Sequence, residues 1–316
     1  MSSAPSRCSD TVKEILLGHG ACRVAIASVS PVDTQAQELY ARWLEAGNHG
    51  SMQYLENYPD IRRNPQLLLP GARSIICCAF AYHPAPVNAP LRIASYALGT
   101  DYHLAIRERL ERAANALREL LGGDTRVCVD TAPLRERYWA VRSGLGVMGM
   151  NNHVIIPGIG SYILLGEILT TAELTPDTPI DGDCGQCGRC VKACPTGALQ
   201  PDGSVDARKC LSYLTIEHRG AFEPGTDLHG CLYGCDRCAA ACPHNRHADT
   251  TGTIPELQPR QELLKLTLEE CLTMSQQQFS TLFRHSAIKR TKLAGLRRNA
   301  EQIAKKSHEP EGPHDL

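Results

Sequence analysis

The pattern of hydrophobic and polar positions divides the chain into parts. Up to about residue 175, segments with apolar residues on one helical face alternate with short β-branched or apolar runs. The spacing predicts helices over residues 10–17, 34–46, 102–121 and 134–143, and strands over residues 22–29, 74–81, 126–129, 154–156 and 162–169. Such alternation is typical of an α/β domain. The adjacent runs VIIPG and SYILLGEIL resemble a hairpin, so we expect a mixed sheet.

The remainder of the chain has a different pattern. The connector TTAELTPDTPIDGD leads into a cysteine-rich segment. Helical periodicity then returns over residues 261–272, 275–284 and 291–305, before a polar tail. We therefore predict three parts, which are residues 1–175, 176–250 and 251–316.

Composition and charge exclude several classes of protein. Of 316 residues, 42% are hydrophobic, and 33 Lys+Arg against 34 Asp+Glu give a net charge of -1, as in ordinary globular proteins. Charge alone gives no argument for a nucleic-acid partner. No run approaches the roughly 18 apolar residues of a membrane span, and the start lacks the pattern of a signal peptide. We expect a cytoplasmic protein without a membrane partner, in which 15 cysteines indicate metal binding or catalysis and not disulfides.

The cysteines between residues 184 and 242 have the spacing of iron–sulfur ligands. Cys184, Cys187, Cys190 and Cys194 are followed by proline, in the C-x2-C-x2-C-x3-C-P pattern of two-cluster bacterial ferredoxins. A second run repeats this spacing without its first member. The prediction is one 4Fe-4S cluster on Cys184, Cys187, Cys190 and Cys242, and another on Cys194, Cys235, Cys238 and either Cys210 or Cys231. A zinc ribbon is the alternative, but zinc does not require triplet spacing followed by Cys-Pro.

One stretch of the first part has candidate chemistry. In VCVDTAPLRERYWAVRSGLGVMG, a strand pattern ends at Asp130, where α/β folds usually bind ligands. The alternative is that Asp130 caps the next helix. GLGVMG fits G-x-G-x-x-G, yet it follows a helix and not a strand, so we reject nucleotide binding there. We expect its glycines to let the backbone approach something flat or bulky.

Six motifs, in this order, resemble epoxyqueuosine reductase: VDTAPLRERYWAVRSGLG, GSYILLGEILT, the ferredoxin run ending CPTGAL, VDARKCLSYLTIEHRG, LYGCDRCAAACPHN and RHSAIKRTKLAGLRRNA. The resemblance covers nearly the whole chain. It implies a mixed-sheet, cobalamin-binding α/β reductase domain, an inserted-type, two-cluster, ferredoxin-like domain and a short, basic, helical C-terminal segment. The implied reaction reduces epoxyqueuosine, at the wobble position of tRNA, to queuosine. The implied cofactors are base-off cobalamin and two 4Fe-4S clusters.

The resemblance also implies roles for individual residues. Asp130 matches the family's proton donor, and Cys210 matches the fourth ligand of the second cluster, which leaves Cys231 spare. The corrin would lie against SGLGVMG and GSYILLG, with contacts at Arg62, Ala94, Asp130, Val154, Leu165 and Ser212. Two departures stand out. Family members commonly have lysine where this chain has Met150, and many continue into helical repeats that add tRNA surface, whereas this chain ends about sixteen residues after RRNA.

The implied reaction needs two electrons and two protons. No amino-acid side chain supplies such electrons, so a cofactor must deliver them, while acid groups supply the protons. The clusters would reduce cobalamin one electron at a time to nucleophilic cob(I)alamin. We expect cobalt to attack an epoxide carbon while Asp130 protonates the oxygen. A donor near pH 7 needs a raised pKa, which burial beside the corrin would provide. An external donor such as flavodoxin or ferredoxin would supply electrons, and we expect a monomer.

A protein with almost no net charge needs a local basic patch to bind tRNA. The expected contacts are Arg208, Lys209, Arg219, Arg284, Lys289, Arg290, Arg297 and Arg298, the alternative being a solvated helix face. The modified base would leave its stack to reach the cobalt. Two other functions fit the same features: another corrinoid-dependent reductase, similar to a reductive dehalogenase, and a non-catalytic, ferredoxin-type electron carrier.

Overall fold

A four-stranded antiparallel sheet forms the centre of the first half of the protein. The computed structural model describes residues 4–86, 89–246 and 249–307. The sheet order is β1-β2-β7-β4, with β1 (Arg23–Ser28), β2 (Ser74–Ala81), β7 (Ile163–Thr170) and β4 (Thr125–Cys128). All three ladders are antiparallel. The α/β class is confirmed, but the expected mixture of strand directions in this sheet is wrong.

The pairing of the later strands explains that error. β6 (Val154–Ile155) pairs with β5 (Val147–Met148) and not with β7. β7 instead fills the space between β2 and β4. The expected hairpin between VIIPG and SYILLGEIL is therefore wrong, and Ile156 forms only a local bridge with Gly160, which precedes the second run.

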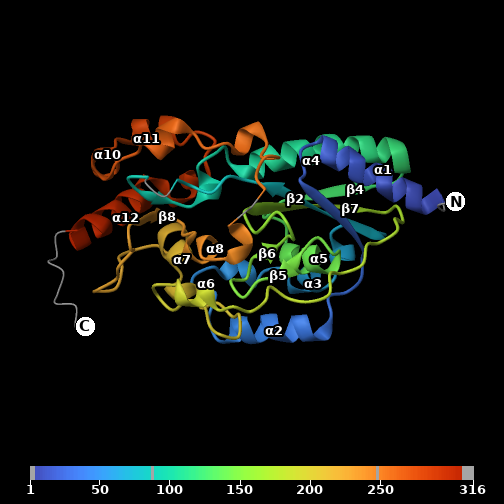
Figure 1. The fold of residues 1–316 in the computed structure, drawn as a ribbon, viewed down its shortest axis with the longest axis horizontal. Helices are drawn as coiled ribbons and strands as arrows, with labels where there is room; N and C mark the ends of the chain where they lie inside the picture. Colours follow the sequence, from blue (N-terminus) through green and yellow to red (C-terminus); the bar gives the residue numbers. More distant parts are fainter. Residues whose placement is uncertain (1–3, 87–88, 247–248, 308–316) are drawn as a thin grey trace.

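Helices cover both faces of the sheet (Figure 1). α1 (Ala4–Gly18) and α4 (Tyr102–Leu121) lie on one face, and α5 (Glu136–Arg142) lies on the other. The alternation along β2 follows from the two-residue period of a strand: Ile76 and Phe80 face α1 and α4, whereas Ile75 and Cys77 face α5. Each fully buried aliphatic or aromatic side chain contributes about 1.5–3 kcal/mol to folding.

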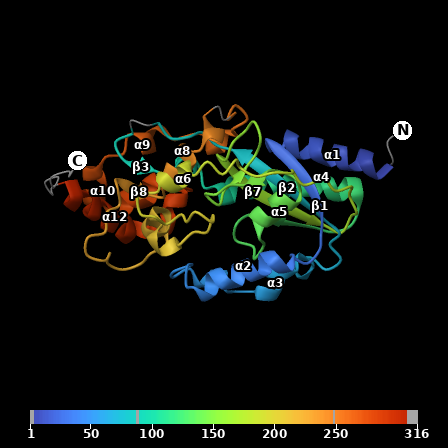
Figure 2. The ribbon, with the colours of Figure 1, turned by 60° about the horizontal axis from the view of Figure 1, so that its bottom comes forward.

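A peripheral segment joins the sheet to the cysteine-rich part. It contains α2 (Thr34–Glu45) and α3 (Pro59–Arg63), which lie together below the sheet in Figure 2. α2 begins at the N-cap Asp33 and buries none of its residues. Trp43 Nε1 donates to the carbonyl of Val205, at 2.7 Å. This bond ties α2 to the cysteine-rich segment.

The cysteine-rich segment is built from short elements. These are α6 (Arg189–Lys192), α7 (Leu211–Ile216), β8 (Cys231–Tyr233) and α8 (Arg237–Ala240). β8 pairs in parallel with β3 (Arg92–Ile93) from the first half of the chain.

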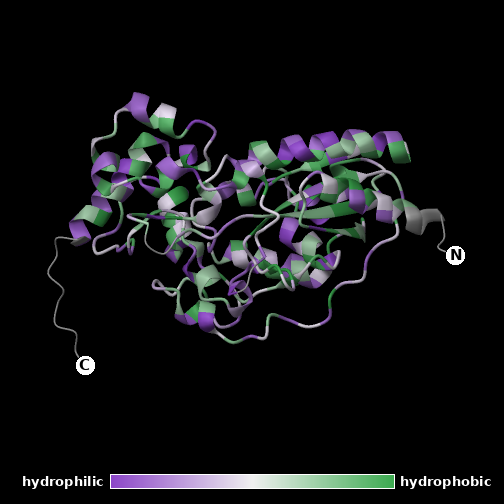
Figure 3. Ribbon diagram, turned by 45° about the horizontal axis from the view of Figure 1, so that its top comes forward, coloured by the Kyte–Doolittle hydropathy of each residue, from purple (hydrophilic) through white to green (hydrophobic). Residues whose placement is uncertain are grey.

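The C-terminal helices pack on β8 and α7 through a shared apolar core. They are α9 (Gln261–Leu264), α10 (Leu268–Thr273), α11 (Gln276–Leu282) and α12 (Lys292–Ser307). The single helix expected over residues 261–272 is wrong, because a capping box of Thr267 and Glu270 starts a new helix. Figure 3 shows hydrophobic and hydrophilic stripes on the longer helices. Within the described ranges, no helix is long and apolar enough to cross a membrane. The expected polar tail beyond residue 307 lies outside them.

Candidate functional site

Asp130 lies two residues after the end of β4 and meets the first turn of α4. Its backbone is in the left-handed region, with φ 53°. Its Oδ2 lies 2.9 Å from Nε2 of His103, and Nδ1 of His103 lies 2.7 Å from Oδ1 of Asp101, the N-cap of α4. One imidazole therefore bridges two carboxylates, and the Asp130 side chain remains 55% exposed.

This bridge decides where the proton of the site resides. Burial lowers the pKa of His103, but hydrogen bonds and charge from Asp101 and Asp130 outweigh it and raise that pKa to about 9. Burial raises the pKa of Asp130, yet His103 outweighs it, and the net pKa lies below its ordinary value. The expected raised pKa of Asp130 is wrong for this arrangement, in which the imidazolium holds the proton.

Asp130 does not cap the helix that follows it. Arg135 occupies the N-cap of α5 without a side-chain capping bond. The backbone N–H of Asp130 instead donates to Oε1 of Glu136, in the first turn of α5. The capping alternative is therefore wrong, and the loop leaves the Asp130 carboxylate free to face His103.

Groups from distant parts of the chain surround the Asp130 carboxylate. The charge of Arg290 contributes to lowering the Asp130 pKa. The Arg290 guanidinium makes hydrogen bonds to both carboxylate oxygens of Glu217, at 2.5 and 2.9 Å, and lies 5.8 Å from the ring centre of Tyr54. Arg137 donates to the carbonyl of Asn152. Arg290, expected only as a tRNA contact, thus belongs to the surroundings of the candidate acid.

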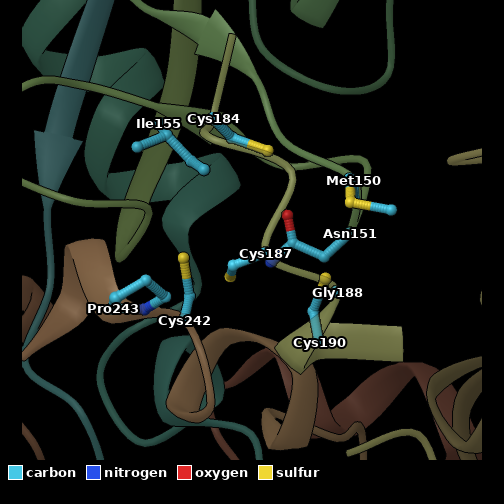
Figure 4. Close-up of a pocket in the computed structure, with 9 residues that line it drawn as sticks. All are labelled: Met150, Asn151, Ile155, Cys184, Cys187, Gly188, Cys190, Cys242 and Pro243. Atoms are coloured by element: carbon cyan, nitrogen blue, oxygen red, sulfur yellow. The ribbon is translucent and has the colours of Figure 1, made fainter. Parts of the chain in front are cut away.

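Four of the predicted cluster ligands line one pocket (Figure 4). These are Cys184, Cys187, Cys190 and Cys242, with Met150, Asn151 and Ile155 beside them. The Nδ2 group of Asn151 is buried and lacks an acceptor, and the sulfur atoms of a cluster accept such N–H groups. Over the described ranges, no three His, Cys, Asp or Glu side chains converge closely enough to hold a single metal ion.

The remaining predicted ligands form a second group. Burial raises the pKa of Cys210, with further increases from Cys235 and Cys194. Burial also raises the pKa of Cys238, with further increases from Cys235, Cys210 and Asp236. Cys231 is buried in β8, where its thiol makes a hydrogen bond with Cys235. The fold therefore places Cys210 among the three other sulfurs, while Cys231 contacts one of them.

Of the expected corrin contacts, strand register places Leu165 at the Asp130 end of the sheet. Cys128 pairs with Glu167, so Leu165, two residues earlier on β7, lies at the same end as Asp130. Ala94 and Val154 are buried. The Arg62 guanidinium donates to the carbonyls of Asn57 and Tyr54, and Ser212 is half-buried on α7.

Glycine is required in SGLGVMG for a reason other than the expected one. A Cβ on Gly144 would meet the carbonyl oxygen of Thr178 at 2.2 Å, and one on Gly146 would meet that of Ile155 at 2.5 Å. The close neighbour is the protein's own backbone. The expectation that these glycines make room for something flat or bulky is replaced by this packing.

The basic residues expected at tRNA fall into two groups. Arg298 donates to the carbonyls of Leu214, His218 and Gly220, and Arg297 donates to that of Met274. These two guanidiniums tie α12 to its surroundings. The exposed members are Arg208, Lys209, Arg219, Arg284, Lys289 and Arg290, although Arg208 also pairs with Asp206 and Arg219 with two carbonyls.

Sequence reasoning missed Asp101 and His103. A usable signal was present, because the predicted helix over residues 102–121 and the strand after it are separated by only a short Gly-Gly-Asp turn. A helix and strand joined so tightly pack antiparallel. That places the start of the helix near the end of the strand, where Asp130 lies.

Comparison with known proteins identifies two families in the chain. Residues 62–131 match the family described as "Epoxyqueuosine reductase QueG, DUF1730". Residues 183–245 match the family described as "4Fe-4S double cluster binding domain". The second match covers the two groups of cysteines, so this part of the chain is a double-cluster domain.

Curated relatives match over almost their whole length. The epoxyqueuosine reductase of Gloeobacter violaceus is 40% identical over 288 residues, which cover 88% of this chain and 90% of the relative. That of a Synechococcus species is 38% identical over 305 residues, covering 95% and 94%.

Solved structures give the same result. A crystal structure of epoxyqueuosine reductase with an epoxyqueuosine-modified tRNA-Tyr stem loop has a TM-score of 0.86 and 30% identity, covering 94% of this chain and 80% of that one. The Bacillus subtilis enzyme, with its catalytic aspartate loop swung out of the active site, has a TM-score of 0.84 and 30% identity, covering 94% and 81%.

Proposed function

Because this chain belongs to the epoxyqueuosine reductase family, we propose that it reduces epoxyqueuosine, at the wobble position of tRNA, to queuosine. The observation that carries the proposal is the carboxylate of Asp130, held by His103 at the open end of the sheet. The Bacillus subtilis relative has a catalytic aspartate loop, and we assign that role here to the loop of Asp130. The family matches favour this function over a dehalogenase or a simple electron carrier.

We assign the cysteines to two 4Fe-4S clusters. Cys184, Cys187, Cys190 and Cys242 would hold the first, and Cys194, Cys210, Cys235 and Cys238 the second. The buried N–H of Asn151 supports the first site, since a cluster sulfur would be its missing acceptor. The second site is supported by the position of Cys210 beside Cys194 and Cys235.

The surface beside Asp130 suits a flat apolar macrocycle. Along β7, Ile163, Leu164 and Leu165 are only half-buried, although the residues that follow on the same central strand are buried. We propose that base-off cobalamin covers these side chains, with further contacts from Arg62, Ala94, Val154 and Ser212. When bound, the cofactor supplies the strongly reducing metal centre that no side chain provides.

Asp130 and His103 would then handle the protons. Conversion of an epoxide to an alkene takes up two electrons and two protons and releases the oxygen as water. His103, protonated at neutral pH, would pass a proton to Asp130 through their 2.9 Å contact, and Asp130 would give that proton to the opening oxygen.

The tRNA would approach from the side of Tyr54 and Arg290. The stem loop bound to a relative supports an anticodon arm as the ligand. We assign phosphate contacts to the exposed Arg208, Lys209, Arg219, Arg284, Lys289 and Arg290. We leave out Arg297 and Arg298 because they are half-buried and their guanidiniums bond to backbone carbonyls. The enzyme would act as a monomer in the cytoplasm and take electrons from a small donor such as flavodoxin or ferredoxin.

The experiment is anaerobic reconstitution with iron, sulfide and cobalamin, followed by a reductant-driven assay on tRNA carrying epoxyqueuosine. Mass spectrometry of the nucleosides should detect queuosine only when cobalamin is present. Asp130→Asn should bind cobalamin and tRNA but form queuosine at least about 100-fold more slowly. No conversion by the reconstituted wild type would overturn the substrate, and full activity of Asp130→Asn would overturn the proton donor.

A further inference from the structure

Two buried carboxyl groups lie directly under the Asp130 loop. Glu167, near the middle of β7, is 0% exposed. It lies opposite Cys77 on β2 and Cys128 on β4, so all three side chains face α5. Its side chain meets that of Glu136 on α5, whose Oε1 accepts the backbone N–H of Asp130 at 2.5 Å. The two carboxyls therefore link the central strand to the loop that carries the candidate acid.

No donor in the described part of the chain reaches either carboxylate oxygen of Glu167. Its neighbour Glu136 is another carboxyl, and two carboxylates cannot form a hydrogen bond without a proton. Two adjacent buried charges of like sign would also repel strongly, so one carboxyl stays neutral. The contact is therefore compatible with burial only when a proton lies between the two groups.

We propose that Glu136 and Glu167 share one proton and that this singly protonated pair positions Asp130 for the reaction. The neutral carboxyl of Glu167 donates to Glu136, and Glu136 keeps an oxygen for the N–H of Asp130. The bond fixes the left-handed backbone at Asp130, a conformation that is unfavourable for a residue other than glycine. Glu136 is thus a positioning residue and not a proton donor to substrate.

The charges around the pair agree with this state. Burial, with the charge of Asp130, raises the pKa of Glu136 to about 7, and burial, with Glu136, raises that of Glu167 well above its ordinary value. The groups that face the pair are Arg137 on α5, Asp130 on its loop, and the thiols of Cys77 and Cys128. Arg137 is the cation among them. Glu136 therefore ionises near pH 7 while Glu167 keeps its proton above that pH, and this leaves the pair singly protonated.

In one relative, the catalytic aspartate loop is swung out of the active site, and this movement suggests a role for the pair of Glu136 and Glu167. A loop that can leave the site needs a contact that holds it in place. The N–H of Asp130 and the carboxyl of Glu136 form such a contact, and its strength depends on the proton below. This inference rests on the proposed function only for its kinetic test.

The first test is infrared spectroscopy of the purified chain, which needs neither substrate nor cobalamin. The C=O stretch of a protonated carboxylic acid should persist in the wild type above about pH 7, where ordinary carboxyl groups are ionised and Glu167 keeps its proton. Glu167→Gln should remove that component, because the side-chain amide of this variant can donate to an ionised Glu136. Glu119→Gln, at an exposed position of α4, should leave the band unchanged. An absent band, or one unaffected by Glu167→Gln, would overturn the shared proton whatever the substrate proves to be.

The second test is the pH profile of a single turnover. The wild-type rate should rise as the pH increases through about 7, where Glu136 ionises and the pair becomes singly protonated, whereas Glu167→Gln, with an amide donor in place of the proton, should reach its full rate at lower pH. Both rates should fall as His103 loses its proton near pH 9. Glu136→Ala should be about 10- to 100-fold slower at unchanged tRNA affinity. Glu136→Gln keeps an acceptor oxygen and should recover most of the rate. Coincident profiles for the wild type and Glu167→Gln, or equal losses in both Glu136 variants, would overturn the positioning role.

Discussion

Nε2 of His103 lies 2.9 Å from Oδ2 of Asp130, and this contact joins two groups that are 27 residues apart in the sequence. The helix start that carries His103 and the strand end that carries Asp130 are both fixed by packing on the sheet. The imidazolium is held at the N-terminus of α4, where the helix dipole disfavours a cation. The carboxylates of Asp101 and Asp130 offset that penalty.

Replacing His103 should change the proton chemistry without changing the fold. In His103→Gln, the carboxylate of Asp130 loses its cation, and burial should then raise the Asp130 pKa. We expect queuosine formation to slow by about 100-fold or more, with cobalamin and cluster contents unchanged. Between about pH 6 and pH 10, the rate of queuosine formation by His103→Gln should also lack the decrease near pH 9 that is expected of the wild type. His19→Gln, at the C-terminal end of α1, is the matched control.

The same contact should make thermal stability depend on pH. The folded pKa of His103 is raised, so its contribution is complete below the unfolded value of about 6.5 and is lost as the pH rises through about 9. The folded pKa values of Asp101 and Asp130 are lowered, so their contribution is present above the unfolded value of about 3.8 and is lost as the pH falls below it. Tm should therefore fall more steeply toward pH 9 in the wild type than in His103→Gln. Parallel curves would contradict the ion pair.

The helices and strands of the first half were predictable because each buries one regular face. The pattern predicted α4 and β2 with the observed bounds, since α4 has a continuous apolar stripe and β2 is apolar after Ser74. The break between α9 and α10 was missed, although Thr267 and Glu270 have the spacing of a capping box. Periodicity alone does not show where one amphipathic helix ends and another begins.

The candidate site was predictable only in part. Spacing located the cysteines, because cluster ligands are local in sequence, and a strand end located Asp130. The proton on His103 and the carboxyl pair of Glu136 and Glu167 depend on which strands are neighbours. The expected hairpin misplaced β7, so the residues facing α5 could not be derived from the sequence.

Cysteine substitutions should distinguish the two candidates for the second cluster. Cys210→Ala should reduce bound iron and sulfide to about half, since one of two clusters loses a ligand. Cys231→Ala should keep both clusters, because Cys210 lies beside Cys194, Cys235 and Cys238 and completes the second set of four ligands. Iron and sulfide analysis of anaerobically purified protein, with electron paramagnetic resonance of the reduced clusters, gives the answer. The reverse outcome would make Cys231 the ligand.

Substitution of two basic residues of the C-terminal part should have different effects, one on stability and the other on tRNA binding. Arg298→Ala removes hydrogen bonds to three carbonyls and a guanidinium 4.3 Å from the Phe222 ring, and should cost about 2–4 kcal/mol of stability. Lys289→Ala changes an exposed side chain and should alter stability by no more than about 0.5 kcal/mol. The Lys289→Ala change should also weaken tRNA binding, and the slope of log affinity against log salt concentration should become smaller by about 1. Unchanged tRNA affinity in Lys289→Ala would remove that residue from the proposed surface.

The reduction potential of the first cluster should depend on whether position 150 carries a positive charge, and Met150 carries none. Its side chain lines the pocket of Cys184, Cys187, Cys190 and Cys242. A reduced cluster has one more negative charge than an oxidised one, so a nearby cation favours the reduced form. Met150→Lys should therefore raise the midpoint potential by an amount on the order of tens of millivolts.

Met150→Gln, which is polar but uncharged, should leave that potential nearly unchanged. An anaerobic redox titration followed by electron paramagnetic resonance measures both variants against the wild type. A higher potential makes the cluster a weaker reductant, so the lysine variant should also reduce bound cobalamin more slowly. Equal shifts in the two variants would indicate that polarity or packing at position 150, and not charge, controls the cluster.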